Sequence, residues 1–346
     1  MRRWTIFLLL LLCLSVACQT EEPTAVGFLR GDFAFIPYQE RVQIIDISDL
    51  SEPEFVTEIS LPGNVAKVVA NGRYLYIAHS ANTSSWTNEG GPPGAGLQIV
   101  DVSDPTQPHK LGYFHSKSLP TDLLLHGDLV YLATWEFIDI VDVTDRDAPR
   151  QLGMFSEGAT SLAYADNQLA AGFGGCSFRS GYCTGGLHLY DLAEPERPSL
   201  IGRLQLDNIP GYDVALANGL AVGTGKGLWI TELANVENLQ VNGRDFLDNG
   251  WLYAAQVLLD DHLAYVTQYD GLHIMDISQP TNPTLIGYFP TANQLTDLVL
   301  RDGRLYLTGW SGLEILDVTD PATPQLLGYY ATEYPAQIFP QPTATP

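Results

Sequence analysis

The sequence predicts an all-β protein that folds as a seven-bladed β-propeller of four-stranded antiparallel blades. Three observations lead to this fold class. A short phrase with apolar, variable, apolar, variable and acidic positions recurs seven times. The copies follow one another at intervals close to the length of a propeller blade. Around each copy, short β-branched or aromatic segments alternate with Gly, Asp, Asn and Pro, which is typical of strands and turns and not of helices.

The repeated phrase defines the blades. Its acidic positions are separated by 55, 41, 49, 41, 44 and 41 residues. A chance pattern would not keep this spacing, so each copy marks one structural unit. The seven acidic residues are Asp46, Asp101, Asp142, Asp191, Glu232, Asp276 and Asp317.

Each phrase lies in a longer unit that predicts four strands. In the last unit, apolar segments at residues 298–300 and 305–307 flank a turn, the phrase forms a third strand, and residues 326–330 form a fourth. A segment with Asp320 and Pro324 separates the last two strands. No helix is expected after the apolar N-terminal segment.

The radial arrangement follows from burial. A four-stranded sheet cannot bury both faces alone, whereas sheets arranged around an axis cover one another and leave short protected edges. A linear stack of sheets is the alternative, but it needs polar capping repeats, which we do not find. The fifth unit departs most, with Glu232 for Asp and residues 235–238 for the usual Asp-Pro segment. The first and last units are both complete, so the closure of the ring stays open.

Two copies of the phrase resemble a known repeat. Leu97-Gln-Ile-Val-Asp101 and Ile138-Asp-Ile-Val-Asp142 are similar to the Leu-Val-Ile-Val-Asp repeat of the LVIVD repeat proteins of bacterial and archaeal surfaces. The resemblance covers nearly all of residues 25–332. It implies a propeller on an extracytoplasmic protein, and it brings no established catalytic residues.

The N-terminus has the parts of an export signal. Arg2 and Arg3 precede an apolar run at residues 6–14 and a stretch of small residues, and Cys18 follows directly. This end resembles the lipobox of bacterial lipoproteins, although Ser15 stands where that motif usually has Leu. The resemblance implies that Cys18 is lipidated. The alternative is an ordinary signal peptide with an incidental cysteine. The apolar run is too short for a transmembrane helix, which needs about 20 residues.

These features divide the chain into four parts. We expect a lipoprotein signal peptide at residues 1–17, a lipidated N-terminus and short linker at 18–24, the propeller at 25–335 and a Pro-rich tail at 336–346. The expected location is the bacterial cell envelope, outside the cytoplasm, where acyl chains hold the protein to a membrane.

The charge of the chain limits its partners. The formal net charge is −23, and removal of Arg2 and Arg3 with the signal changes it to −25. No cluster of Lys and Arg remains that could follow a phosphate backbone, so nucleic acid is not an expected partner. Docking on anionic lipid also requires basic patches, so we expect attachment to the membrane through the N-terminal lipid alone.

The repeated acids have two interpretations. Segments such as Asp101-Val-Ser-Asp104-Pro suggest calcium, but a calcium site needs about six to eight oxygen atoms around one point. These acids are instead distributed one blade at a time, and Asp, Ser and Pro are residues that build turns. We therefore predict turns between the third and fourth strands and no metal site.

Two cysteines lie close together in the fourth unit. Cys176 and Cys183 flank a Gly-containing loop in a chain predicted to be exported, where oxidising conditions allow a disulfide. We predict a disulfide between them. The alternatives are a free thiol pair or a metal site, but the spacing is not Cys-x-x-Cys and no paired His lies nearby.

Signatures of catalysis are missing from the sequence. The seven histidines form no His-x-His or His-Glu-x-x-His arrangement, and His188 and His273 occupy equivalent places in the phrase. No Gly-x-Ser-x-Gly elbow and no Gly-rich loop that opens a helix is found. These patterns predict no catalytic residue, metal or cofactor.

One face of the predicted propeller collects unusual residues. The loops that join second and third strands share this face with the connections between blades, and two of them are enlarged, at residues 81–96 and 174–186. Aromatic residues lie in or beside these loops: Tyr38, Trp86, Trp135, Phe173, Tyr269 and Trp310. Polar residues occupy equivalent positions at the start of the first strand: Lys67, Asp122, Ser161, Asp213, Gln256 and Asp297.

Polar groups around a central depression, flanked by aromatic residues, are typical of a ligand or partner site. The alternative interpretation is that the polar side chains hydrate the channel or bond neighbouring backbone groups, while the aromatic residues cover blade junctions. The predicted binding face comprises Lys67, Asp122, Asp213, Gln256, Asp297, Trp86, Trp135, Tyr269 and Trp310.

Two functions agree with these sequence features. The first is a non-catalytic binding or scaffolding module that recognises a protein or glycan. The second is a hydrolase or lactonase in which Asp122, Asp213 and Asp297 hold a divalent cation at the channel mouth as a Lewis acid. The second requires these three carboxylates to converge on one point.

Overall fold

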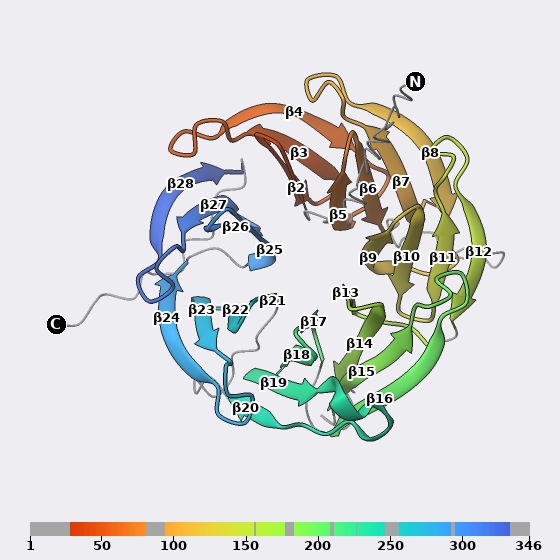
Figure 1. The fold of residues 1–346 in the computed structure, drawn as a ribbon. Helices are drawn as coiled ribbons and strands as arrows, with labels where there is room; N and C mark the ends of the chain where they lie inside the picture. The colour runs from red at the N-terminus through yellow and green to blue at the C-terminus, as the bar shows by residue number, and fades with distance from the viewer. Residues whose placement is uncertain are drawn as a thin grey trace, which may run out of the picture.

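Seven four-stranded sheets form a closed ring around a central channel (Figure 1). The structure is a computed structural model, and it describes residues 28–80, 94–155, 157–176, 183–207, 211–225, 227–245, 256–291 and 295–332. In every sheet the strands are antiparallel and follow chain order from the channel to the rim. The predicted fold class, a seven-bladed propeller of four-stranded blades, is confirmed.

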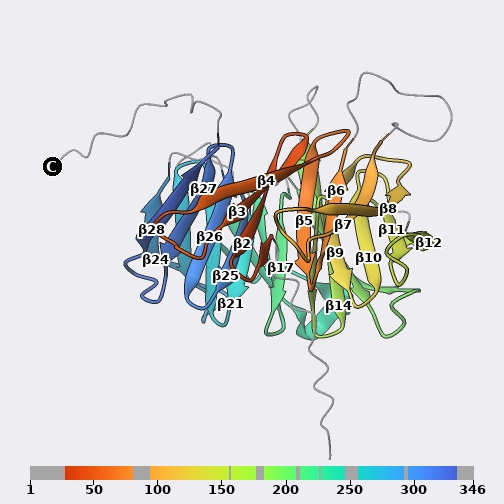
Figure 2. The ribbon, with the colours of Figure 1, turned by 90° about the horizontal axis from the view of Figure 1, so that it is seen from above.

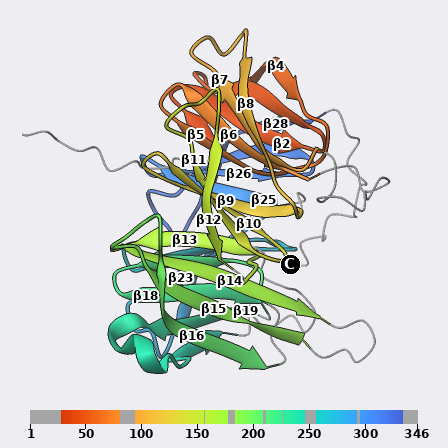
Figure 3. The same ribbon diagram turned by 90° about the vertical axis from the view of Figure 1, so that its right-hand side faces the viewer.

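The sheets define blades 1 to 7. The first four are blade 1 (β1 Leu29–Arg30, β2 Phe33–Tyr38, β3 Arg41–Asp46, β4 Glu54–Ser60), blade 2 (β5 Val65–Asn71, β6 Tyr74–His79, β7 Gly96–Asp101, β8 His109–His115), blade 3 (β9 Pro120–His126, β10 Leu129–Thr134, β11 Ile138–Asp142, β12 Arg150–Phe155) and blade 4 (β13 Ser161–Ala165, β14 Gln168–Cys176, β15 Cys183–Asp191, β16 Ser199–Asp207). The others are blade 5 (β17 Val214–Ala217, β18 Leu220–Gly225, β19 Gly227–Glu232, β20 Gly243–Asp245), blade 6 (β21 Val257–Asp260, β22 Leu263–Gln268, β23 Gly271–Asp276, β24 Thr284–Pro290) and blade 7 (β25 Leu295–Arg301, β26 Arg304–Gly309, β27 Gly312–Asp317, β28 Gln325–Ala331). Figure 2 shows the ring edge-on, and Figure 3 shows β13 to β16 of blade 4 side by side in chain order.

The repeated phrase forms the third strand of each blade, and its acid shapes the turn that follows. Asp46 Oδ1 accepts a hydrogen bond of 2.8 Å from the Ser48 N–H, and Asp317 Oδ1 accepts one of 2.9 Å from the Thr319 N–H. The same bond recurs at four more copies, at Asp101, Asp142, Asp191 and Asp276. The carboxylates therefore satisfy turn backbone, as the turn interpretation predicts.

A glycine in the fourth strand of a blade lets the next blade approach closely. The Gly112 N–H donates a bond of 2.8 Å to the Arg146 carbonyl in the turn of blade 3. A Cβ at Gly112 would overlap this turn, and a Cβ at Gly287 would overlap the Pro321 carbonyl of blade 7. The spacing between neighbouring blades therefore depends on the missing side chain.

The ring closes by packing of blade 7 against blade 1. In Figure 1 the first blade (red) and the last blade (blue) lie side by side. Gly328 of β28 contacts the Leu50 carbonyl of blade 1, and Arg301 Nη1 donates a bond of 2.6 Å to the Gly31 carbonyl. Phe35 of blade 1 and Leu313 of blade 7 belong to one hydrophobic cluster. Within the described residues, neither blade borrows a strand from the other.

Blade 5 departs from the others, as its sequence suggests. A short 3₁₀ helix, η1 at Leu233–Asn238, replaces the Asp-Pro turn, and β20 has only three residues. The expectation of no helix is therefore wrong at this one position. The reason is local: Glu232 replaces the Asp that makes the turn in other blades, and the segment has no Pro.

Two further expectations concern export. No helix in the described part of the chain has the length and apolar character needed to span a membrane. Cys176 and Cys183 are direct Cα partners in the β14–β15 ladder, and Cys183 is buried. This pairing provides the proximity that the predicted disulfide needs. Cys18 lies outside the described residues.

We expect Gly328→Ala to destabilise the protein by about 3 kcal/mol, because the new methyl group would collide with the backbone of blade 1. Gly175→Ala is the matched control, since a Cβ there meets no atom within 4 Å. Urea unfolding of both variants measures the difference. Equal stability of the two variants would contradict the proposed closure contact.

Candidate functional site

The starts of the inner strands bring the predicted polar residues to one end of the channel. Asp122 and Asp297 are the third residues of β9 and β25, and Lys67 is the third residue of β5. In these three blades the strand register shifts next to the polar residue. A register irregularity of this kind redirects a side chain, and it is common beside functional sites. Ser161, Asp213 and Gln256 begin or directly precede the inner strands of blades 4, 5 and 6.

Lys67 and Asp297 form an ion pair across the end of the channel. The Nζ of Lys67 lies 2.8 Å from Asp297 Oδ2 and 2.9 Å from Oδ1. The pair joins blade 2 to blade 7, past blade 1. This contact is compatible with the shortness of the innermost strand of blade 1, since β1 has two residues in the described part of the chain.

Two of the predicted acids bond to the backbone of the following blade. Asp122 Oδ2 accepts a bond of 2.6 Å from the Leu162 N–H of blade 4, and its Oδ1 accepts one of 2.8 Å from Leu123. Asp213 Oδ2 accepts a bond of 2.9 Å from the Val257 N–H of blade 6. For these two residues the structure supports the alternative interpretation, in which the side chain satisfies neighbouring backbone.

Burial and mutual charge shift the proton affinities of this cluster. Burial raises the pKa of Asp213 to about 7, against the opposing effects of the Val257 N–H and the Lys67 ammonium. Burial also raises the pKa of Asp122. For Lys67, burial alone would lower the pKa, but the carboxylates of Asp297, Asp122 and Asp213 raise it above its ordinary value. Lys67 is thus the counter-charge that three acids share.

The acids do not converge as metal ligands. Among the described residues, no group of three His, Cys, Asp or Glu side chains is close enough together to hold a metal ion. Backbone N–H groups and the Lys67 ammonium are the partners of Asp122, Asp213 and Asp297. The convergence that the hydrolase hypothesis requires is therefore not found in the part of the chain that the structure describes.

Exposed aromatic side chains stand around the same end of the propeller. Trp135, Tyr269 and Trp310 are 61%, 51% and 66% exposed, and each is the first residue after the second strand of its blade. The turn at Trp310 is held in place, because its carbonyl accepts a bond of 3.0 Å from Thr332 Oγ1. Large exposed aromatic groups on fixed turns are suited to contact with a ligand.

The other three aromatic residues predicted for this face are not exposed in the way that Trp135, Tyr269 and Trp310 are, or lie outside the described residues. Phe173 stacks on His188 at a centroid distance of 4.8 Å, and both residues belong to blade 4, so this contact lies within a blade and not at a blade junction. Tyr38 is half-buried at the end of β2. Trp86 lies outside the described residues.

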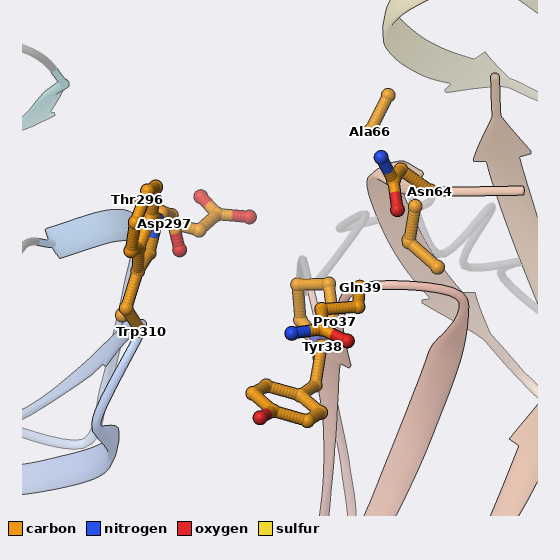
Figure 4. Close-up of a pocket in the computed structure, with 10 residues that line it drawn as sticks. Pro37, Tyr38, Gln39, Asn64, Ala66, Thr296, Asp297 and Trp310 are labelled. Carbon is orange, nitrogen blue, oxygen red and sulfur yellow. The ribbon is translucent and has the colours of Figure 1, made fainter. Parts of the chain in front are cut away.

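A pocket of about 450 Å³ lies between blades 7, 1 and 2. Figure 4 shows Trp310, Thr296 and Asp297 on one side, facing Tyr38, Gln39 and Asn64 on the other. The Asp297 carboxylate extends into the space between the two sides. The volume of the pocket is in the range of small-molecule sites. The pocket is lined by Pro37, Tyr38, Gln39, Asn64, Val65, Ala66, Thr296, Asp297, Gly309 and Trp310.

Repeat alignment found only part of this pocket. It predicted Tyr38, Asp297 and Trp310, but it missed Gln39 and Asn64 at the rim. Gln39 had a detectable signal, because it occupies the turn position that Trp310 occupies in blade 7. Gln39 also adopts a φ of 52°, in the left-handed region, where the other described non-glycine residues are Asp or Asn. Such a backbone costs about 1–2 kcal/mol and often marks a functional turn.

We expect Lys67→Met to destabilise the protein by about 2–4 kcal/mol at pH 8, because it leaves three acids without their shared counter-charge. The double variant Lys67→Met, Asp297→Asn should lose less stability than Lys67→Met alone, since it also removes one of the negative charges. Urea unfolding of the two single variants and the double variant gives the coupling energy. Strictly additive losses would show that the pair contributes nothing.

We expect Asp213→Asn to raise the free energy of unfolding by on the order of 1–3 kcal/mol at pH 8 and to leave it nearly unchanged at pH 4. The folded-state pKa of Asp213, about 7, lies above the ordinary value of 3.8 that applies to the unfolded chain. The unfolded state therefore releases the proton first, and stability falls as the pH rises from about 4 to 7. Asn keeps an acceptor for the Val257 N–H. Equal effects at both pH values would argue against the raised pKa.

Comparison with known proteins identifies the repeat. The LVIVD repeat matches residues 28–60, 62–83, 93–114, 253–291 and 296–332. These segments fall in blades 1, 2, 6 and 7, and every residue that lines the pocket lies within them. No curated protein matches the sequence.

Solved structures share the fold at low sequence identity. A functionally unknown protein from Desulfotomaculum acetoxidans is 10% identical, with a TM-score of 0.60, over 86% of this chain and 95% of its own. A protein from Lactobacillus plantarum is 11% identical, with a TM-score of 0.64, over 86% of this chain and 98% of its own. A chain of the mitotic checkpoint complex is 13% identical, with a TM-score of 0.54, over 75% of this chain and 76% of its own. At these identities the similarity shows the propeller fold alone.

Proposed function

Because the chain belongs to the LVIVD repeat family and forms a seven-bladed propeller, we propose that it is a non-catalytic binding module for a glycan at the bacterial cell surface. The observation that carries this proposal is the pocket between blades 7, 1 and 2, where Trp310 lies on one side and Tyr38 on the other. Aromatic rings supply contact area for a sugar ring, and the amides of Gln39 and Asn64 provide donors and acceptors for hydroxyl groups.

A protein partner is the second candidate. The support for it is the spread of Trp135, Tyr269 and Trp310 over the same end of the ring, well beyond one pocket. Exposed Trp and Tyr residues of this kind are typical centres of protein interfaces. Nucleic acid is not a proposed partner, because the formal net charge of −23 opposes it.

The proposed location is the outer surface of a bacterial membrane, to which lipid on Cys18 attaches the protein. The support is the sequence alone: an apolar segment, small residues and a cysteine in lipobox order. In this arrangement the acyl chains and not the acidic surface hold the protein to the bilayer.

We expect Trp310→Ala to weaken binding to a glycan retained on a microarray of bacterial surface oligosaccharides by about tenfold, because it removes one wall of the pocket. Phe55→Ala is the control: Phe55 is 49% exposed on β4, the outer strand of blade 1, and does not line the pocket. Fluorescence on the array measures both variants. If both variants weaken binding equally, or if the array retains no glycan, the glycan-binding proposal is wrong. A protein partner is then the remaining candidate.

We expect Cys18→Ser to move the protein from the detergent phase to the aqueous phase in Triton X-114 partitioning of expressing bacteria, because the lipid attachment atom is lost. Cys183→Ser is the control, since that cysteine is buried in blade 4. Wild-type protein found in the aqueous phase would contradict the lipid anchor.

A further inference from the structure

Resting on the proposed function, we propose that the pocket between blades 7, 1 and 2 recognises an amino sugar and binds its positively charged ammonium group against the carboxylate of Asp297. The proposal joins three independent features of the pocket: an excess of negative charge, an acceptor oxygen directed into the cavity, and an exposed aromatic wall.

The charge balance favours a cation. Three carboxylates, of Asp122, Asp213 and Asp297, share the single ammonium of Lys67. Asp297 is the acid among the described residues that line the pocket, no Lys or Arg is among them, and the Lys67 ammonium that pairs with Asp297 also faces the charges of Asp122 and Asp213. The whole chain carries a formal net charge of −23. A ligand with an ammonium group is therefore attracted, while an acidic sugar is repelled.

The geometry of Asp297 leaves room for a second donor. Its Oδ1 already accepts bonds of 2.9 Å from the Leu298 N–H and 2.9 Å from Lys67. Among the described residues, Oδ2 contacts the Lys67 ammonium alone, at 2.8 Å. A carboxylate oxygen can accept two bonds, so Oδ2 can accept an N–H of an ammonium that enters the pocket. Figure 4 shows this carboxylate extending into the cavity.

The walls suit the ring that carries the amine. Trp310 is 66% exposed, so most of its side chain is accessible to a ligand. A cation beside an aromatic face is attracted by the negative potential of the ring electrons. Asn64 and Gln39 are exposed at the rim opposite Trp310, where their amides can bond sugar hydroxyl groups. The volume of about 450 Å³ exceeds the needs of an ammonium group alone.

The test compares matched ligands by calorimetry at pH 6 and low salt, where the amines of the glucosamine units carry their positive charge. The probes are a glucosamine tetramer, its N-acetylated counterpart, and a short peptide with one lysine. We expect the glucosamine tetramer to bind about tenfold more tightly than the acetylated tetramer and the peptide. This preference should disappear in Asp297→Asn and should weaken in Trp310→Ala, which leaves the Lys67 pair intact.

Asp302→Asn is the matched control for charge. It removes the same charge from blade 7, but Asp302 lies in the turn at the other end of the ring and has a φ of 53°, which Asn tolerates. The preference should survive in this variant, and circular dichroism checks that each variant is folded.

Four outcomes overturn the inference. Equal binding of the two tetramers removes the ammonium site and leaves the glycan-binding function standing. Tighter binding of the lysine peptide assigns the pocket to a protein partner instead. A preference for the amine that persists in Asp297→Asn shows that another group holds it. If neither tetramer binds while the microarray retains a different glycan, the inference fails and the proposed function stands.

Discussion

Seven sheets can close into a ring only if each sheet packs on both neighbours. At the closest approach between neighbouring blades, a glycine of one blade lies directly against the backbone of the next. Fourth-strand glycines meet the carbonyl of the next blade at Gly112, Gly202, Gly243, Gly287 and Gly328. Any larger residue would push the sheets apart. In the six blades other than blade 5, the Asp at the end of the phrase shapes the turn after the third strand, and a register shift recurs between third and fourth strands. Even blade 5, which lacks the Asp, retains Gly243 against Pro280.

The candidate site arises where this regular packing is interrupted. Other inner strands have four to seven residues, while β1 has two in the described part of the chain. Lys67 of blade 2 then reaches Asp297 of blade 7, and the pocket opens beside them. A ring of identical blades would give seven similar clefts at this end, so a distinct ligand site requires one blade to differ. Within the described residues, blade 1 has the shortest inner strand, and blade 7 contributes the acid and the tryptophan.

Much of the fold follows from the sequence, and the site follows in part. The phrase and its spacing predict the strands, the blade number and the turns, because these features repeat and each copy supports the others. The same reasoning placed Lys67, Asp122 and Asp297 at one end of the channel. It did not predict that Asp122 bonds to Leu162 while Asp297 bonds to Lys67, since equivalent positions have different neighbours. Asn64 was missed because it lies in a connection between blades, where no repeat position exists for comparison.

The ion pair between Lys67 and Asp297 joins residues that are 230 positions apart in the chain. Contacts of such large sequence separation form slowly, because a long loop must close before they can stabilise the structure. By contrast, the strand ladders within the described residues all connect strands that are adjacent in the chain, so they can form as each repeat becomes available. We therefore expect the blades to assemble in order and the circle to remain open until the C-terminal repeat arrives. During that interval the sides of blades 1 and 7 expose apolar surface, which makes incomplete chains prone to aggregation.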